Sequence, residues 1–131
     1  MRSPAEILRD SSTIALVGAS PRPDRPSHGV MRYLLDAGYR VVPVNPTCAE
    51  VLGIPCTPSL AALHEPIDLV DVFRRPEFCP GVAREAVAVG ARALWLQLGL
   101  VSSEARRIAT EAGLEYVEDE CTAIVHRREV T

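Results

Sequence analysis

The chain has 131 residues, of which 47% are hydrophobic and 24% are charged. This length and composition fit one globular domain and exclude a two-domain enzyme. The formal net charge is −3, so the chain lacks the excess of positive charge with which proteins bind nucleic-acid backbones. We therefore expect no nucleic-acid partner.

All 14 basic residues are arginine, which excludes Schiff-base chemistry on lysine. An anion site must then use arginine side chains or backbone N–H groups. The cysteines Cys48, Cys56, Cys79 and Cys121 include no C-x-x-C pair and have no histidine at ligand spacing, so we expect no metal site. Because the sequence shows neither a signal-peptide pattern nor 18 consecutive apolar residues, we expect a cytoplasmic protein that does not contact a membrane.

Helix and strand signals alternate along the chain. Ser3 and Glu6 have the spacing of a capping box, Ser27 can cap a second helix, and Ser102 or Ser103 can cap a later one. The expected elements, in chain order, are a leading helix within 1–12, a strand at 13–18, a proline-rich loop at 19–26, a helix at 27–38, a strand at 39–44, an edge strand at 51–56, a brief helix at 59–64, a strand at 67–73, a helix at 82–90, a strand at 93–96, a helix at 103–113, a strand at 114–117 and a loose tail at 126–131.

This alternation with short connections predicts an α/β fold with a single domain spanning residues 1–131. We expect a doubly wound, mainly parallel, Rossmann-like sheet of five to six strands with helices on both faces. In such a sheet, ligands bind beyond the carboxyl ends of the strands, where the winding direction reverses.

The loop after the first strand is the first candidate binding site. Gly18, Ala19 and Ser20 are small residues that let a ligand approach the backbone, and the helix beginning near Ser27 presents its positive dipole end. With Arg22 and Arg25 in reach, we interpret this region as a pocket for a diphosphate. The alternative is that the glycine only ends a strand and the arginines are solvated.

Two absences argue against an NAD site. The dinucleotide fingerprint G-x-G-x-x-G does not occur. At the end of the second strand, where NAD proteins place an acidic residue for the ribose, this chain has Val44, Asn45 and Pro46. The long loop at 19–26 instead leaves room for a bulkier, more heavily phosphorylated ligand.

At six places the sequence resembles the small stand-alone coenzyme A-binding proteins, which are similar to the coenzyme A-binding domain of the succinyl-CoA synthetase alpha subunit. These places are Val17-Gly18-Ala19-Ser20, Arg25-Pro26-Ser27, Pro43-Val44-Asn45-Pro46, Val72-Phe73-Arg74, Trp95-Leu96-Gln97-Leu98-Gly99, and Asp119 with Cys121. Their order and spacing cover nearly the whole chain. The resemblance implies a Rossmann-like fold that holds coenzyme A without a known reaction.

The resemblance also implies positions for the ligand. It places Gly18, Ala19, Ser20 and the loop to Ser27 around the diphosphate, and Asn45 with Pro46 at the adenosine end. It places Phe73 and Arg74 at the tip of the next strand, and Gln97 with Gly99 along the neighbouring wall.

Two of these positions have physical alternatives. Arg74 and the adjacent Arg75 suit a further phosphate, or they form ion pairs with Asp71 or Glu77. Gln97 ends a buried strand, so its carboxamide needs a hydrogen-bond partner, which is either the ligand or a neighbouring loop. We favour the ligand.

The function that we expect is binding of coenzyme A or an acyl-CoA by a non-catalytic or regulatory module. The alternatives are a small NAD(P)- or nucleotide-binding enzyme, a subunit of a larger CoA-ligase-like system, and an interaction protein that has lost its ligand. The residues able to do chemistry, Cys121, His28, His64 and His126, form no recognisable catalytic constellation. This weighs against an enzyme.

Overall fold

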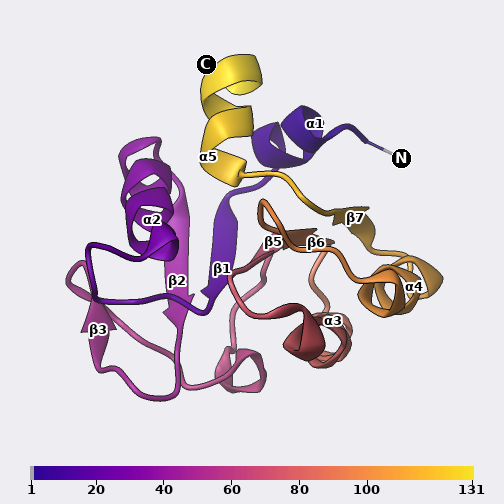
Figure 1. Ribbon diagram of the computed structural model, residues 1–131, viewed down its shortest axis with the longest axis horizontal. Helices are drawn as coiled ribbons and strands as arrows, with labels where there is room; N and C mark the ends of the chain where they lie inside the picture. The colour runs from indigo at the N-terminus through magenta and orange to yellow at the C-terminus, as the bar shows by residue number, and fades with distance from the viewer. Residues whose placement is uncertain (1) are drawn as a thin grey trace.

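A computed structural model describes residues 2–131 (Figure 1). Its main sheet has five parallel strands, which are β1 (Thr13–Val17), β2 (Arg40–Val44), β5 (Leu69–Val72), β6 (Ala93–Leu96) and β7 (Glu115–Val117). Their spatial order is β2-β1-β5-β6-β7. The chain moves outward from β1 to β2 and then crosses to β5 on the other side, so the switch point lies between β1 and β5. The expected parallel Rossmann-like sheet is confirmed.

Helices cover both faces of this sheet, as expected (Figure 1). They are α1 (Pro4–Arg9), α2 (Pro26–Asp36), η1 (Leu60–Ala62), η2 (Pro76–Phe78), α3 (Cys79–Ala88), α4 (Ser103–Glu111), α5 (Thr122–Val125) and the π-helix η3 (His126–Val130). One core lies under α3 and α4, and a second core lies under α1, α2 and α5.

Strand β1 shows why the sheet needs two helical layers. Ile14 and Leu16 enter the core under α1 and α2, whereas Ala15 and Val17 enter the core under α3 and α4. Successive side chains point to opposite faces of a strand, so an apolar run without alternation requires burial on both faces. Full burial of a large aliphatic side chain contributes about 1.5–3 kcal/mol to stability.

The edge strand expected at 51–56 is absent from the main sheet. Instead β3 (Glu50–Val51) and β4 (Ile54–Pro55) form a separate antiparallel hairpin. The turn residues Leu52 and Gly53 have φ of 51° and 79°. Positive φ at both central residues is the geometry of a tight hairpin turn, which folds the segment back on itself before it can extend the sheet.

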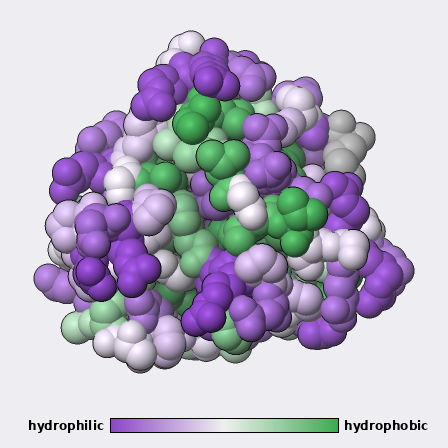
Figure 2. Space-filling view, in the orientation of Figure 1, coloured by the Kyte–Doolittle hydropathy of each residue, from purple (hydrophilic) through white to green (hydrophobic). Residues whose placement is uncertain are grey.

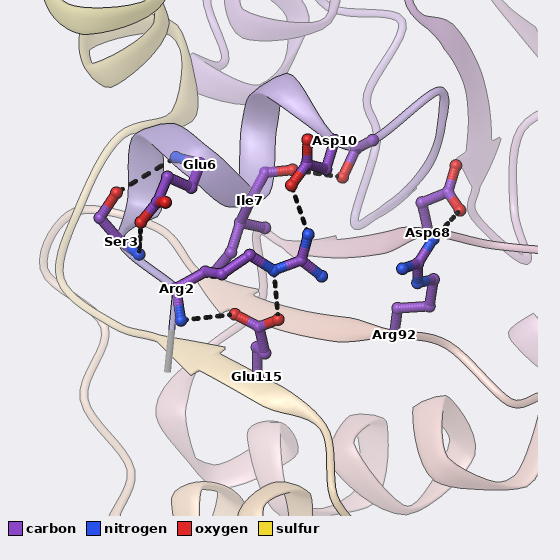
Figure 3. Close-up of polar contacts among 9 residues, drawn as sticks. Arg2, Ser3, Glu6, Ile7, Asp10, Asp68, Arg92 and Glu115 are labelled. Carbon is purple, nitrogen blue, oxygen red and sulfur yellow. Dashed lines mark hydrogen bonds and ion pairs between the residues drawn. The ribbon is translucent and has the colours of Figure 1, made fainter.

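The N-terminal helix is anchored by charged contacts (Figure 3). Ser3 and Glu6 form the expected capping box, and hydrogen bonds from Ser3 lower the pKa of Glu6. Arg2 donates from Nε to Glu115 on β7 at 2.8 Å and also pairs with Asp10. These contacts join the start of the chain to the edge of the sheet.

The prediction of a loose tail is wrong, because residues 126–130 form the π-helix η3 beside α1 (Figure 1). His126 is buried, its Nδ1 lies 2.9 Å from the Tyr33 hydroxyl, and burial lowers its pKa. Val125 packs in the same core as α1.

In Figure 2 hydrophobic residues gather toward the middle of the visible face and hydrophilic ones surround them.

Candidate functional site

A cavity of about 690 Å³ opens at the carboxyl ends of β1, β2, β5 and β6. Cofactor sites typically have volumes of 300–1,000 Å³. The predicted site residues that line it are Gly18, Ala19, Ser20, Arg22, Arg25, Ser27, Asn45, Phe73, Arg74 and Gln97. Pro46 and Gly99 lie outside its lining. The structure therefore brings ten of the twelve predicted residues together around one space at the switch point.

The cavity wall is strongly cationic. Four arginines, Arg22, Arg25, Arg74 and Arg75, line it without any aspartate or glutamate. Within residues 2–131, only Arg22 of these four has an acidic partner, Asp24, at 3.2 Å on the exposed surface. In a chain of net charge −3, this separation of charge favours an anionic ligand.

The alternative of ion pairs for Arg74 and Arg75 is not observed. Across residues 2–131, no carboxylate oxygen lies within 4.0 Å of the guanidinium of Arg25, Arg74 or Arg75. The Arg74 guanidinium instead lies 4.1 Å from the centroid of the Phe78 ring, a cation–π contact that leaves its N–H groups free to meet an anion.

Gly18 is required by the packing of the protein itself. Its φ is +88°, and a Cβ atom at this position would lie 2.3 Å from the carbonyl oxygen of Phe73 at the end of β5. The absent side chain makes room for a neighbouring strand, whereas we expected it to make room for the ligand. A larger residue here would disturb the switch point before it affected a bound molecule.

The loop after β1 is held by side chains from two other elements. Asn45 donates from Nδ2 to the Ala19 carbonyl at 2.7 Å, and its Oδ1 accepts from the backbone N–H and hydroxyl of Thr47. The Nδ1 of His28, which is buried in α2, lies 3.0 Å from the Ser20 carbonyl. Asn45 is therefore a brace for the loop, with its Oδ1 atom and one Nδ2 hydrogen engaged by the protein.

The same loop offers backbone donors to the cavity. Over the described residues, the amide nitrogens of Ala19 and Ser20 donate to no protein acceptor. Helix α2 begins at Pro26 with Arg25 as its N-cap residue and no side-chain cap. The expectation that Ser27 caps this helix is wrong, because Ser27 lies inside the first turn and is buried. The positive end of α2 is thus uncapped where it borders the cavity.

Gln97 is held by a buried polar cluster. Its Nε2 donates to Asp71 Oδ1 at 2.6 Å and to Thr122 Oγ1 at 2.9 Å. Thr122 in turn donates to Asp71 Oδ2 at 3.0 Å. The protein thus supplies the partners of the Gln97 amide nitrogen, for which we had favoured the ligand.

This cluster leaves one side of the Gln97 amide for a ligand. Both Nε2 hydrogens are used, and reversing the amide would set two acceptor oxygens against each other at an ionised Asp71. The Oε1 atom accepts no hydrogen bond from residues 2–131. Every fully buried side-chain oxygen in that range has a hydrogen-bond partner, so Oε1 is not fully buried. Oε1 is therefore accessible from the cavity that Gln97 lines.

Asp71 is fully buried on β5, and this burial raises its pKa to about 7. The hydrogen bonds from Gln97 and Thr122 act in the opposite direction but are weaker. An acidic residue inside an apolar strand was a visible signal of this cluster in the sequence. The role of Thr122 carried no such signal, because it is far from Asp71 and Gln97 along the chain.

Several lining residues were not expected as ligand contacts. They are Val30, Pro76, Leu98, Leu100, Cys121 and Ile124, whereas Pro26 belongs to the expected loop and Arg75 was a candidate for a further phosphate. Leu98, Leu100 and Ile124 give the side near β6 an apolar wall, and Cys121 lies there at the start of α5. No group of three potential metal ligands occurs within residues 2–131, and no helix in that range is long and apolar enough to cross a membrane.

Comparison with known proteins identifies the family. Residues 12–127 match the CoA binding domain family, and the chain belongs to it. It is 47% identical over 121 residues to the uncharacterized protein YneT of Bacillus subtilis, covering 92% of this chain and 90% of that protein. A solved structure of a hypothetical protein from Pyrococcus horikoshii superposes with a TM-score of 0.94 at 41% identity, covering 98% and 90% of the two chains.

The chain is also homologous to part of much larger enzymes. It is 24% identical over 123 residues to an ADP-forming acetate–CoA ligase of Archaeoglobus fulgidus, covering 86% of this chain and 18% of the ligase. The matched region is the coenzyme A-binding region of such synthetases. The chain thus spans about a fifth of the length of that ligase.

Proposed function

We propose that this chain binds coenzyme A or an acyl-CoA in the cavity at the carboxyl ends of the strands, as a ligand-binding module that does not itself catalyse a reaction. The observation that carries the proposal is that four arginines and no described acidic residue line the cavity, beside free backbone amides at the switch point. Membership of the CoA binding domain family supports the same ligand.

The cavity offers groups for each part of this ligand. The amides of Ala19 and Ser20 and the start of α2 suit the diphosphate, with Arg25 beside them. Arg74 and Arg75 suit a further phosphate. The adenosine lies toward Asn45 and Pro46, at the end of β2, in this proposal.

The remaining arm of coenzyme A is long, carries two amide groups and ends in a thiol. The apolar wall near β6 suits its carbon chain, and the accessible Oε1 of Gln97 suits one of its N–H groups. The arm then ends toward Cys121. No histidine lines the cavity, which supports binding over acid–base catalysis at this site.

Native mass spectrometry of freshly purified protein tests the proposal. We expect an additional mass that matches coenzyme A or an acyl-CoA, or uptake of added coenzyme A by the unliganded chain. A retained nicotinamide dinucleotide would instead support the alternative of a small NAD(P)-binding enzyme. Failure to take up added coenzyme A would contradict the proposal.

A further inference from the structure

Two cysteines meet at the open end of the β3–β4 hairpin, one on each side of it. Cys48 Sγ and Cys56 Sγ lie 2.9 Å apart, and both residues are free thiols of intermediate exposure. The sulfur atoms of a disulfide lie about 2.05 Å apart. Bond formation therefore requires an approach of only about 0.9 Å.

The backbone already holds the two thiols in place. The Cys56 N–H donates to the Ala49 carbonyl at 2.9 Å, which extends the ladder of the hairpin by one step beyond the Glu50 and Pro55 pair. The tight turn at Leu52 and Gly53 closes the other end. The folded hairpin therefore keeps the two cysteines at its open end close together.

We propose that Cys48 and Cys56 are a redox-active dithiol that forms an intramolecular disulfide by exchange with a low-molecular-weight disulfide such as glutathione disulfide. The Cys48 thiolate attacks one sulfur of the small disulfide and forms a mixed disulfide. The first small thiol leaves with the proton that Cys48 has lost. Cys56 then attacks Cys48 Sγ and gives up its own proton, and the second small thiol leaves. Two protein thiols are oxidised, and one small disulfide is reduced to two thiols.

The surroundings of the pair determine which cysteine attacks first. Burial, together with the hydrogen bond to Cys48, raises the pKa of Cys56 to about 12. The thiolate is the attacking species in exchange, so Cys56 is the weaker nucleophile while both thiols are free. Within this proposal we take Cys48 as the attacking residue and Cys56 as the resolving residue.

The disulfide would close the segment that follows the Asn45 brace. The Asn45 N–H donates to the Thr57 carbonyl, and the Thr57 N–H donates to the Pro43 carbonyl, each at 2.9 Å. The hairpin is thereby tied to the end of β2 and, through the Asn45 side chain, to Ala19 in the cavity wall. The proposal does not depend on which ligand the cavity binds.

The test is to incubate the folded chain in glutathione buffers of increasing oxidised fraction, quench in acid and measure the intact mass. We expect a loss of about 2 Da and a linked peptide pair that contains Cys48 and Cys56. Cys121→Ser is the matched control, because this variant removes a thiol outside the hairpin and keeps the mass loss. Cys48→Ser and Cys56→Ser remove it, and Cys56→Ser accumulates a stable mixed disulfide with glutathione on Cys48.

A second measurement uses the parent protein alone. The oxidised form should melt at a higher temperature than the reduced form, because the cross-link restricts the unfolded chain. The proposal is overturned if both thiols remain alkylatable in fully oxidised buffer. It is equally overturned if the linked peptides pair other cysteines, or if the parent stops at a mixed disulfide.

Discussion

Gln97 donates its side-chain N–H to Asp71 Oδ1 at 2.6 Å, and this bond determines which atom of the amide faces the cavity. Asp71 lies in β5, and Gln97 directly follows the neighbouring strand β6. While it is ionised, the Asp71 carboxylate accepts hydrogen bonds and cannot donate them. Asp71 therefore orients the amide nitrogen inward, and the Oε1 atom of Gln97 remains an acceptor for a ligand.

Replacing Asp71 with Asn should change how stability depends on pH. Burial raises the pKa of Asp71 to about 7 from 3.8, so between pH 4 and 7 the folded chain binds a proton that the unfolded chain has released. The free energy of unfolding of the parent therefore decreases as the pH rises through this range. The asparagine cannot titrate and removes that contribution. As the pH rises from 4 to 8, the free energy of unfolding of the variant should therefore increase relative to that of the parent by on the order of 3 to 4 kcal/mol.

Urea denaturation of both proteins at steps of one pH unit measures this difference. Every other titrating group is common to the two chains and cancels in the comparison. A difference that stays constant from pH 4 to 8 would show that Asp71 titrates normally.

Gln97→Leu should weaken coenzyme A binding and also destabilise the fold. The leucine offers no acceptor to the ligand and leaves Asp71 without one of its buried donors, a loss of about 1–3 kcal/mol. Thr122→Val is the matched control, because it removes the two hydrogen bonds of the Thr122 hydroxyl but keeps the Gln97–Asp71 bond. Calorimetric titration should show weaker binding in the first variant and near-parental binding in the second. Parental affinity in Gln97→Leu would remove Gln97 from the ligand contacts.

Arg25→Gln and Arg74→Gln should each lower the affinity for coenzyme A by about 3- to 30-fold at low salt. The effect should shrink as salt is added, because both side chains are exposed and their charges are screened. Arg22→Gln should have a smaller effect, since Asp24 already pairs with Arg22. Titrations at several salt concentrations measure these differences.

Dephospho-coenzyme A separates the roles of these arginines. Replacing an arginine that contacts the diphosphate should lower the affinity for both ligands equally, and we expect this of Arg25, which precedes the first turn of α2. Replacing an arginine that contacts the 3′-phosphate should lower the affinity for coenzyme A only. Arg107→Gln is the control, because its partner is Glu111 on α4, outside the cavity. If Arg25→Gln and Arg74→Gln bind like this control at low salt, neither of these two arginines contacts the ligand.

Gly18→Ala should destabilise the protein, whereas Gly29→Ala should not. A Cβ atom at Gly18 would lie 2.3 Å from the Phe73 carbonyl at a positive φ, so we expect a cost of about 1–3 kcal/mol or more. Gly29 lies within α2 with open space around it, and alanine there should stabilise the helix by about 0.5–1 kcal/mol. Thermal unfolding of the two variants gives the comparison. Equal melting temperatures would contradict the close approach of β1 and β5.

The order of the main elements could be predicted because local signals and tertiary structure agree. Apolar runs without alternation marked the buried strands, and Ser3 and Ser102 cap helices as their spacing indicates. The hairpin was misassigned because its two positive φ angles include one at Leu52, a residue that rarely adopts them. The tail was misassigned because its helix forms by packing against α1, which no local signal reveals.

The site was predictable in its location but less so in the role of each residue. The ends of parallel strands converge whatever lies between them, which placed Gly18, Asn45, Phe73 and Gln97 together. Whether a polar side chain faces a ligand or another protein group depends on partners distant in sequence. Asn45 illustrates this, since it binds the Ala19 carbonyl in the folded chain.

Calorimetric titration of the unliganded chain with coenzyme A, with NAD as the comparison ligand, tests the central claim most directly. The arginine-lined cavity and the missing acidic residue at the end of β2 predict saturable binding of coenzyme A at one site per chain, and no measurable heat with NAD. Equal affinity for both ligands, or binding of NAD alone, would contradict the assignment of this cavity to coenzyme A.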